Sequence, residues 1–263
     1  FPQYWQAWEK QLCFFSKNHK AVALDLRGFH LSSKPTEISD YQMEVLVEDI
    51  RQLILHLGYT KASIIGHDWG GSIAWDFAAR YPQHTDKLIV INAVPLQGFA
   101  RTLLHNPQQR LASQYIHIVR AIGNDHFFIQ NEFERLFFAF KQRQPAWDLS
   151  ETEKDLYRAS WKLQGDAVLP MLNYYRATPI FPPQNPKDVQ QLETFALAPT
   201  APYQVKAPVL AIWGEKDTAL LSENLDTMAD YAFNLQIQRI PEASHWVVEE
   251  YPEKVNQLIA QFL

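Results

Sequence analysis

Short runs rich in apolar residues alternate along the chain with longer segments that repeat with a helical period. These runs occupy residues 21–24, 62–65, 88–91, 209–213 and 235–240. Apolar runs of strand length, separated by helical stretches, are typical of a parallel β-sheet covered by helices. The pattern therefore predicts an α/β fold.

The helical repeat is clearest in residues 40–57, where the apolar positions form one stripe. Ser39 and Gln42 could form a capping box at the start of this helix, and Gly58 could end it. The last helix of the chain is expected to begin at Pro252, because proline suits the first position of a helix. Helices should thus cover the sheet both early and late in the chain.

The middle of the chain has a different texture. Between residues 96 and 207 the strand-like runs disappear, and helical patterns appear instead at residues 131–141 and 150–163. The segment that returns to the last strands is rich in proline, which suits a connection rather than a helix or strand. We expect residues 1–95 and 208–263 to form one α/β core, with residues 96–207 inserted as a helical cap.

Composition and charge exclude several classes of protein. The 24 Lys and Arg residues against 29 Asp and Glu give a net charge of −5, so no basic excess favours nucleic acid as a partner. The single cysteine, Cys13, excludes an intrachain disulfide and a cysteine-rich metal site. No apolar run approaches the ~20 residues of a membrane span. A cytoplasmic location is favoured, although a targeting segment or membrane anchor upstream of Phe1 would be compatible with the sequence. The sequence does not indicate an oligomeric state.

Glycine is concentrated at one point of the chain. Three of the nine glycines, Gly66, Gly70 and Gly71, lie within six residues, between an apolar strand and a helical segment. The pattern G-x-D-x-G there has the form of a nucleophile elbow, with Asp68 at its centre and His67 expected to be structural. A carboxylate can attack carbon directly and form an ester without a base to deprotonate it. The alternative is that Asp68 only caps the helix that follows.

An acid and a histidine follow the two last strands. Asp217 comes after the strand expected at residues 209–213, and His245 after the one at 235–240. The order Asp68, Asp217, His245 is the order nucleophile, acid, base of α/β hydrolases. Separately, Asp217 could be a turn residue and His245 a loop histidine. Together, at three strand ends, they favour a catalytic triad.

These motifs give the chain a resemblance to the epoxide hydrolases of the α/β-hydrolase superfamily, especially the hydrolase domain of soluble epoxide hydrolases. Residues 66–71 match the elbow of that family in full. Residues 1–5 resemble the end of its His-Gly-Phe-Pro motif, and residues 25–28 its Asp-x-Arg-Gly loop. Within the expected cap, residues 173–176 resemble the Asn-x-Tyr-Arg segment that carries a catalytic tyrosine, here Tyr175.

The resemblance implies a two-step hydrolysis of an epoxide to a vicinal diol. Asp68 would attack a ring carbon while Tyr115, at the place of the first cap tyrosine, and Tyr175 hydrogen-bond the epoxide oxygen. Water would then hydrolyse the ester, deprotonated by His245, which Asp217 would orient. The partners implied are a small-molecule epoxide and water, and no metal or organic cofactor is needed.

The resemblance also assigns roles to main-chain groups. The N–H groups of Trp69 and Phe1 would form the oxyanion hole. The sequence departs from the family pattern at two places. Where the family often has a second glycine in the Asp-x-Arg-Gly loop, this chain has His30 and Leu31. The chain also starts inside the oxyanion motif, so we expect the native protein to carry further strands upstream.

Three other functions compete with epoxide hydrolysis. A haloalkane or fluoroacetate dehalogenase would use the same Asp–His–Asp triad, although the match at Tyr175 and the Phe1–Pro2 pair favour an epoxide. An esterase would need a serine at position 68, which the chain does not have. A ligand-binding α/β-hydrolase-like protein without turnover would be expected to lack an intact triad.

Overall fold

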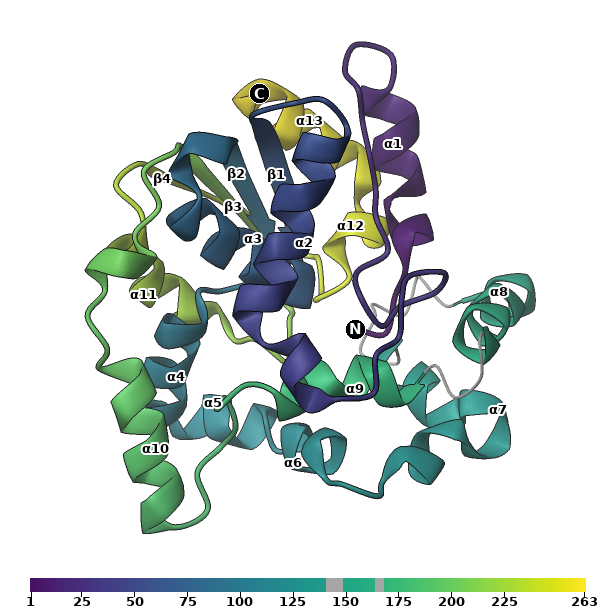
Figure 1. Ribbon diagram of the computed structural model, residues 1–263, viewed down its shortest axis with the longest axis vertical. Coiled ribbons are helices and arrows are strands. Elements are labelled where there is room, and N and C mark those ends of the chain that lie inside the picture. The colour runs from purple at the N-terminus through teal and green to yellow at the C-terminus, as the bar shows by residue number, and fades with distance from the viewer. Residues whose placement is uncertain (141–148, 164–167) are drawn as a thin grey trace.

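A parallel four-stranded sheet forms the centre of the computed structural model, which describes residues 1–140, 149–163 and 168–263 (Figure 1). In these residues the strands follow one another in the order β1-β2-β3-β4, and each neighbouring pair is parallel. The strands are β1 (Ala62–His67), β2 (Thr85–Ile91), β3 (Val209–Gly214) and β4 (Leu235–Ile240). The predicted α/β fold is confirmed.

Helices cover both faces of the sheet because successive strand residues point to opposite sides. On one face, Leu88 and Val90 of β2 share a core with α2 (Met43–His56) and α3 (Asp68–Arg80). On the other, Ile89 and Ile91 pack with the second group of helices. This group comprises α1 (Glu9–Phe15), α12 (Val247–Glu250) and α13 (Pro252–Phe262). α11 (Leu225–Met228) lies between β3 and β4 in the chain.

Seven helices lie between β2 and β3 in the described chain, and we call this set the cap. They are α4 (Leu96–His105), α5 (Pro107–Ala112), α6 (Tyr115–Arg120), α7 (Asp125–Phe140), α8 (Glu151–Lys162), α9 (Val168–Arg176) and α10 (Pro186–Ala196). Figure 1 shows α5 to α9 along one end of the molecule, with α9 next to the first residue of the chain. The ring of Phe1 contacts that of Tyr175 on α9, with centroids 5.5 Å apart. The cap therefore covers the place where the chain begins.

Short 3-10 helices complete the secondary structure. They span Trp5–Trp8, Ile38–Tyr41, Pro82–His84, Ala201–Tyr203, Ser222–Asn224 and Ala229–Tyr231. The longest described helix, α7, has 16 residues and departs from helical geometry at Gln130 and the three residues after it. Among the described helices, none is both long and apolar enough to cross a bilayer.

The expected helix ends are confirmed in part. α13 begins at Pro252, and Gly58, with φ of +83°, follows the end of α2 as predicted. The capping box of Ser39 and Gln42 is wrong, since neither side chain caps the helix. Gln42 is extended, and Ser39 lies inside the preceding 3-10 turn, so α2 begins only at Met43. Of the helix expected at residues 131–141, the last residue lies outside the described ones.

The strand expected at residues 21–24 is also a wrong prediction. The segment has no regular secondary structure and pairs with none of the described strands. A strand needs a neighbour to bond its N–H and C=O groups, and the apolar pattern alone does not supply one. Val22 and Leu24 are accordingly 48% and 38% exposed.

Candidate active site

Asp68 stands at the turn from β1 into α3, with a φ of +50°. This left-handed conformation costs a residue with a side chain energy, and it is found mostly where the surroundings enforce it. Close packing supplies that enforcement. A Cβ atom on Gly66 would lie 2.3 Å from the carbonyl oxygen of Gly70, and one on Gly71 would lie 2.2 Å from the Cβ of Ala93. The turn therefore needs glycine at both places, and it projects Asp68 from the end of the strand.

The structure brings the three expected triad residues together. The Nδ1 of His245 is 2.6 Å from Oδ2 of Asp217, and its Nε2 is 3.3 Å from Oδ1 of Asp68. The side chains of His245, Asp217 and Asp68 are 7%, 0% and 17% exposed. The imidazole thus bridges two carboxylates, and the three residues follow three different strands.

Asn92, which sequence reasoning did not assign to the site, holds the acid in place. Its Nδ2 donates to Oδ2 of Asp217 at 2.8 Å, and its Oδ1 accepts the N–H of Gly214 at 2.7 Å. The other oxygen of Asp217 accepts the N–H groups of Ala219 and Leu220 at 2.8 and 2.9 Å. One signal could have found this residue: an asparagine in an apolar strand run needs a buried hydrogen-bond partner.

The charges of the triad support one another. Burial opposes a charge on His245, but Asp217 and Asp68 outweigh it and raise the pKa of His245 to about 10. Burial likewise opposes ionisation of Asp68, yet the positive charge of the Phe1 amino group, followed by the hydrogen bond with His245, holds the pKa of Asp68 well below its usual range. At neutral pH the site is an imidazolium between two carboxylates.

His67 contacts the main chain rather than a reacting group. Its Nε2 lies 2.8 Å from the carbonyl oxygen of His245, which can only accept a hydrogen bond. Burial, followed by the charge of His245, lowers the pKa of His67 to about 3. A neutral His67 that donates to this carbonyl fixes the backbone of the histidine loop, which fits the structural role expected for it.

The amino group of Phe1, one of the two main-chain groups expected to form an oxyanion hole, contacts Asp68. The nitrogen of Phe1 is 2.7 Å from Oδ2 of Asp68, the oxygen that His245 does not contact. Trp69 follows in the first turn of α3, where main-chain N–H groups have no acceptor within the helix. One carboxylate oxygen therefore faces the amino group of Phe1 and the other faces the imidazole.

Two tyrosines of the cap lie in contact with each other, and one of them contacts the residue after Asp68. Tyr175 is buried, and its ring lies 5.0 Å from that of Trp69 and 6.4 Å from that of Tyr115, measured between centroids. Burial is the largest cause that raises the pKa of both tyrosines, and the negative charge of Asp68 adds to it. Both phenols stay protonated at neutral pH and can donate hydrogen bonds.

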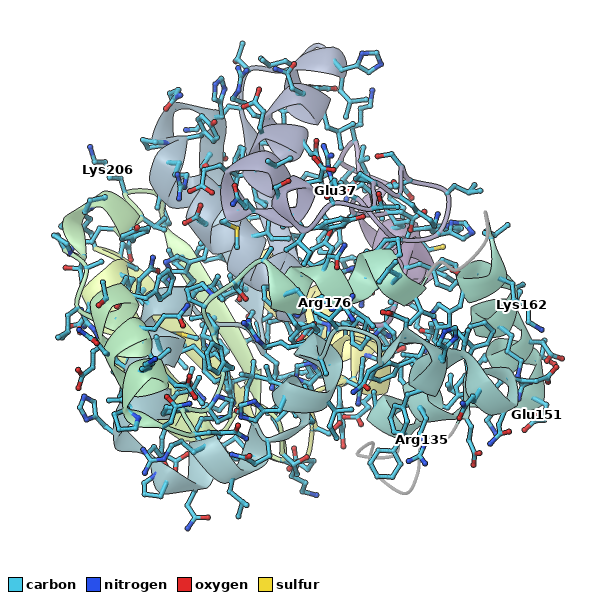
Figure 2. The ribbon with its side chains drawn as sticks, turned by 60° about the horizontal axis from the view of Figure 1, so that its bottom comes forward. Glu37, Arg135, Glu151, Lys162, Arg176 and Lys206 are labelled. Atoms are coloured by element: carbon cyan, nitrogen blue, oxygen red, sulfur yellow. The ribbon has the colours of Figure 1, made fainter. Side chains whose placement is uncertain are left out.

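Two arginines join the helices that carry these tyrosines. Arg120, the last residue of α6, donates to the carbonyl oxygen of Tyr175 on α9. Figure 2 labels Arg176, the last residue of α9. Its guanidinium donates to the carbonyl oxygen of Ala121 and to Asp125, both at 2.9 Å. The link is reciprocal, because each arginine binds the carboxyl end of the other helix.

Comparisons with known proteins show the family to which the chain belongs. The family model for the alpha/beta hydrolase fold matches residues 1–252. The chain is 33% identical to epoxide hydrolase 3 of Xenopus tropicalis and 32% identical to human epoxide hydrolase 4, over 100% of this chain and 69% and 70% of those proteins. The crystal structure of Bacillus megaterium epoxide hydrolase with an inhibitor matches at 36% identity and a TM-score of 0.88, over 100% of this chain and 90% of that one. The chain therefore belongs to the epoxide hydrolases of the α/β-hydrolase fold family.

Proposed function

We propose that this protein hydrolyses a small-molecule epoxide to a vicinal diol through an ester of Asp68. The observation that carries the proposal is an aspartate at the nucleophile elbow, with Oδ1 3.3 Å from an imidazole that a second carboxylate orients. A serine at this place would need the histidine to activate it, whereas a carboxylate does not. The histidine is thus free to act on water in a later step.

In the first step Oδ1 of Asp68 attacks a ring carbon of the epoxide. The new bond is carboxylate oxygen to carbon, and the bond that breaks is carbon to ring oxygen, which keeps the electron pair. Oδ2, held by the nitrogen of Phe1, becomes the carbonyl oxygen of the ester. The low pKa of Asp68 keeps the nucleophile ionised over a wide pH range.

The ring oxygen would become a strongly basic alkoxide and therefore needs a proton donor. Tyr115 and Tyr175 supply two protonated phenols beside Asp68. General acid catalysis of this kind typically accelerates a step by about 10²–10⁴-fold. A halide, in contrast, leaves as a stable anion, so the pair of tyrosines favours an epoxide over a haloalkane.

In the second step water attacks the ester carbonyl carbon, and His245 takes its proton. The ester no longer carries the charge of Asp68, which is one of the causes that raise the pKa of His245 in the resting site. Alkylation thus lowers the pKa of His245, so its imidazolium returns a proton to the tyrosinate left by ring opening and becomes the neutral base that this step requires. Asp217, 2.6 Å from its Nδ1, orients and stabilises the imidazolium that forms.

The tetrahedral intermediate then collapses. Its negative oxygen is Oδ2, which the nitrogen of Phe1 contacts in the resting site, and the N–H of Trp69 would be the second donor to it. The bond from the carbonyl carbon to Oδ1 breaks, and the diol leaves with Oδ1 and with the proton of the hydroxyl group that water added to the carbonyl carbon. Asp68 regains its carboxylate with one oxygen from water, so the atoms of epoxide and water account for the whole reaction.

Oxygen labelling tests the ester directly. In a single turnover in ¹⁸O water, the label should enter the carboxylate of Asp68, and the first diol should carry an unlabelled oxygen from the protein. Mass spectrometry of the peptide that contains Asp68 measures this. Label in the first diol with none in Asp68 would mean that water attacks the epoxide directly. A parallel assay with a haloalkane, expected to give no halide, separates the dehalogenase alternative.

A further inference from the structure

His30 has a main-chain conformation that favours glycine. Its φ is +41°, in the left-handed region where a side chain is disfavoured. Its ring compensates with a specific contact, since Nδ1 lies 2.8 Å from Oδ2 of Asp25. Both side chains are largely buried, at 17% and 10% exposed. The residue is therefore held by what its imidazole binds.

The second oxygen of Asp25 binds the start of the chain. Oδ1 of Asp25 accepts the main-chain N–H of Trp5 at 2.8 Å. The ring of Tyr4 also lies against the imidazole of His30, with centroids 4.8 Å apart and planes inclined by 34°. One carboxylate thus connects the imidazole of His30 to the segment of residues 1–5.

The other end of that segment is the oxyanion donor. The nitrogen of Phe1 lies 2.7 Å from Oδ2 of Asp68. Between the two ends, the carbonyl oxygen of Pro2 accepts the indole N–H of Trp161 at 2.9 Å, and Gln3 donates to the hydroxyl of Tyr157 at 3.2 Å. Residues 1–5 are therefore held at the triad, along the cap and at Asp25.

We propose that His30 is a positioning residue for the oxyanion donor of Phe1, acting through Asp25 and the N–H of Trp5. The inference rests on the proposed function, because it concerns the step in which Oδ2 of Asp68 becomes negative. Without the imidazole, Asp25 loses the partner that aims its carboxylate, and the end of the segment at Trp5 loosens. The N–H of Phe1 then meets the oxyanion with poorer geometry.

This role affects the two chemical steps differently. During alkylation the carboxylate of Asp68 loses its charge, so a donor on Oδ2 gives the transition state no advantage. During ester hydrolysis Oδ2 gains a full negative charge, and the same donor stabilises it. Removing one such donor entirely costs about 10²–10³-fold in other enzymes, so misplacing one should cost roughly tenfold.

The test is His30→Gly, which keeps a left-handed backbone and removes the ring. In rapid-mixing single turnovers the ester should hydrolyse about tenfold more slowly and accumulate, while its formation changes less than about twofold. His30→Asn tolerates the left-handed backbone and offers a side-chain donor to Asp25, so it should recover hydrolysis to within about threefold of wild type. His19→Gly, at an exposed histidine, should change neither step.

Two further measurements separate positioning from a general loss of structure. Hydrogen exchange in the peptide covering residues 1–8 should be faster in His30→Gly, while exchange in the sheet is unchanged. Asp25→Ala should slow hydrolysis as well, and the double variant should be no slower than Asp25→Ala alone, since both residues act on one path. The inference would be overturned if His30→Gly slowed ester formation and ester hydrolysis equally, or if it hydrolysed the ester at the wild-type rate. It would also be overturned if the rate losses of His30→Gly and Asp25→Ala multiplied in the double variant. Absence of an ester in the wild type would instead refute the proposed function.

Discussion

The two sides of the active site are held in different ways. On the core side, Asp217 accepts two main-chain N–H groups and the amide of Asn92, and His245 lies between it and Asp68. On the cap side, Tyr115 begins a helix of six residues, and its ring contacts that of Tyr175 on another helix. The core thus fixes its groups through the main chain at strand ends, whereas the cap fixes its tyrosines through side-chain contacts between helices.

The difference teaches how the two steps of the reaction are divided. In the mechanism that we propose, Asp68 serves both steps and His245 serves the hydrolysis of the ester. In the same proposal, Tyr115 and Tyr175 act only while the ring opens. Changes on the cap side should therefore alter ester formation, and changes to the base should alter ester hydrolysis. If either kind of change altered the rates of ester formation and ester hydrolysis equally, this division between the two sides would be wrong.

The largest effect is expected from His245→Gln. Without the base, the ester should form and then persist, and turnover should fall by at least about 10³-fold. Intact-mass measurement with a reactive epoxide should show an adduct equal to one substrate. His56→Gln, at an exposed histidine of α2, is the matched control and should turn over normally. An absence of adduct in His245→Gln would show that the histidine is also needed for alkylation.

The next largest effect is expected from removing the hydroxyl groups of the two tyrosines on the cap side. Tyr115→Phe and Tyr175→Phe each remove only a hydroxyl, so each should slow ester formation about tenfold or more, equivalent to at least ~1.4 kcal/mol of barrier. The double variant should lose about 10²-fold or more, with ester hydrolysis unchanged. Stopped-flow measurement of single turnovers gives both rates. Tyr59→Phe, at an exposed tyrosine, is the control. A double variant that opens the epoxide at the wild-type rate would favour the dehalogenase alternative.

The core side was largely predictable from the sequence because its signals are local. A strand that runs through three close glycines into a helix marks the elbow, and Asp217 and His245 each follow a strand run. Parallel strands bring their carboxyl ends to one edge, so position after a strand becomes position in space. The contact of Asn92 with Asp217 needed one further step, namely that β2 and β3 are neighbours.

The cap side was not predictable in the same way. Periodicity indicates helices between residues 96 and 207 but not which of their faces meet. Tyr115 and Tyr175 were found by resemblance, and the arginines that join their helices were not found at all. The same limit explains the wrong strand at residues 21–24, because pairing depends on a neighbour that a local pattern cannot reveal.

A difference in pH dependence should separate the two steps in the wild type. The pKa of Asp68 lies well below its usual range and those of both tyrosines are raised, so ester formation should be flat from about pH 5 to 9. Hydrolysis needs neutral His245, whose pKa of about 10 in the resting site falls when the ester removes the charge of Asp68. Hydrolysis should therefore rise about tenfold per pH unit until that lower pKa is passed. A flat hydrolysis rate with a sloping alkylation rate would contradict this assignment.

A smaller effect is expected from Asn92→Ala on the core side. The change leaves the N–H of Gly214 and one oxygen of Asp217 without their partner, and it places alanine at a φ of +37°. Unfolding should become easier by about 2–4 kcal/mol, measured in denaturant. Turnover should fall only about 3- to 10-fold, because the N–H groups of Ala219 and Leu220 still hold Asp217. A loss as large as that of His245→Gln would mean that Asn92 alone orients the acid.

The smallest effect is expected from a substitution at Gly70, the elbow glycine with the most space around it. It tests whether the requirement for glycine is limited to the crowded positions of the turn. A Cβ on Gly70 would meet only the Cδ1 of Leu26, at 4.0 Å, and its backbone is helical within α3. Gly70→Ala should therefore keep turnover within about twofold and, by restricting the unfolded chain, stabilise the fold by up to ~1 kcal/mol. Gly66→Ala is the opposite control, because its Cβ would lie 2.3 Å from a main-chain oxygen and no side chain can move to relieve it. Thermal unfolding and steady-state turnover of both variants make the comparison. Similar losses of stability and turnover in the two variants would mean that the whole turn, rather than only its two crowded positions, requires glycine.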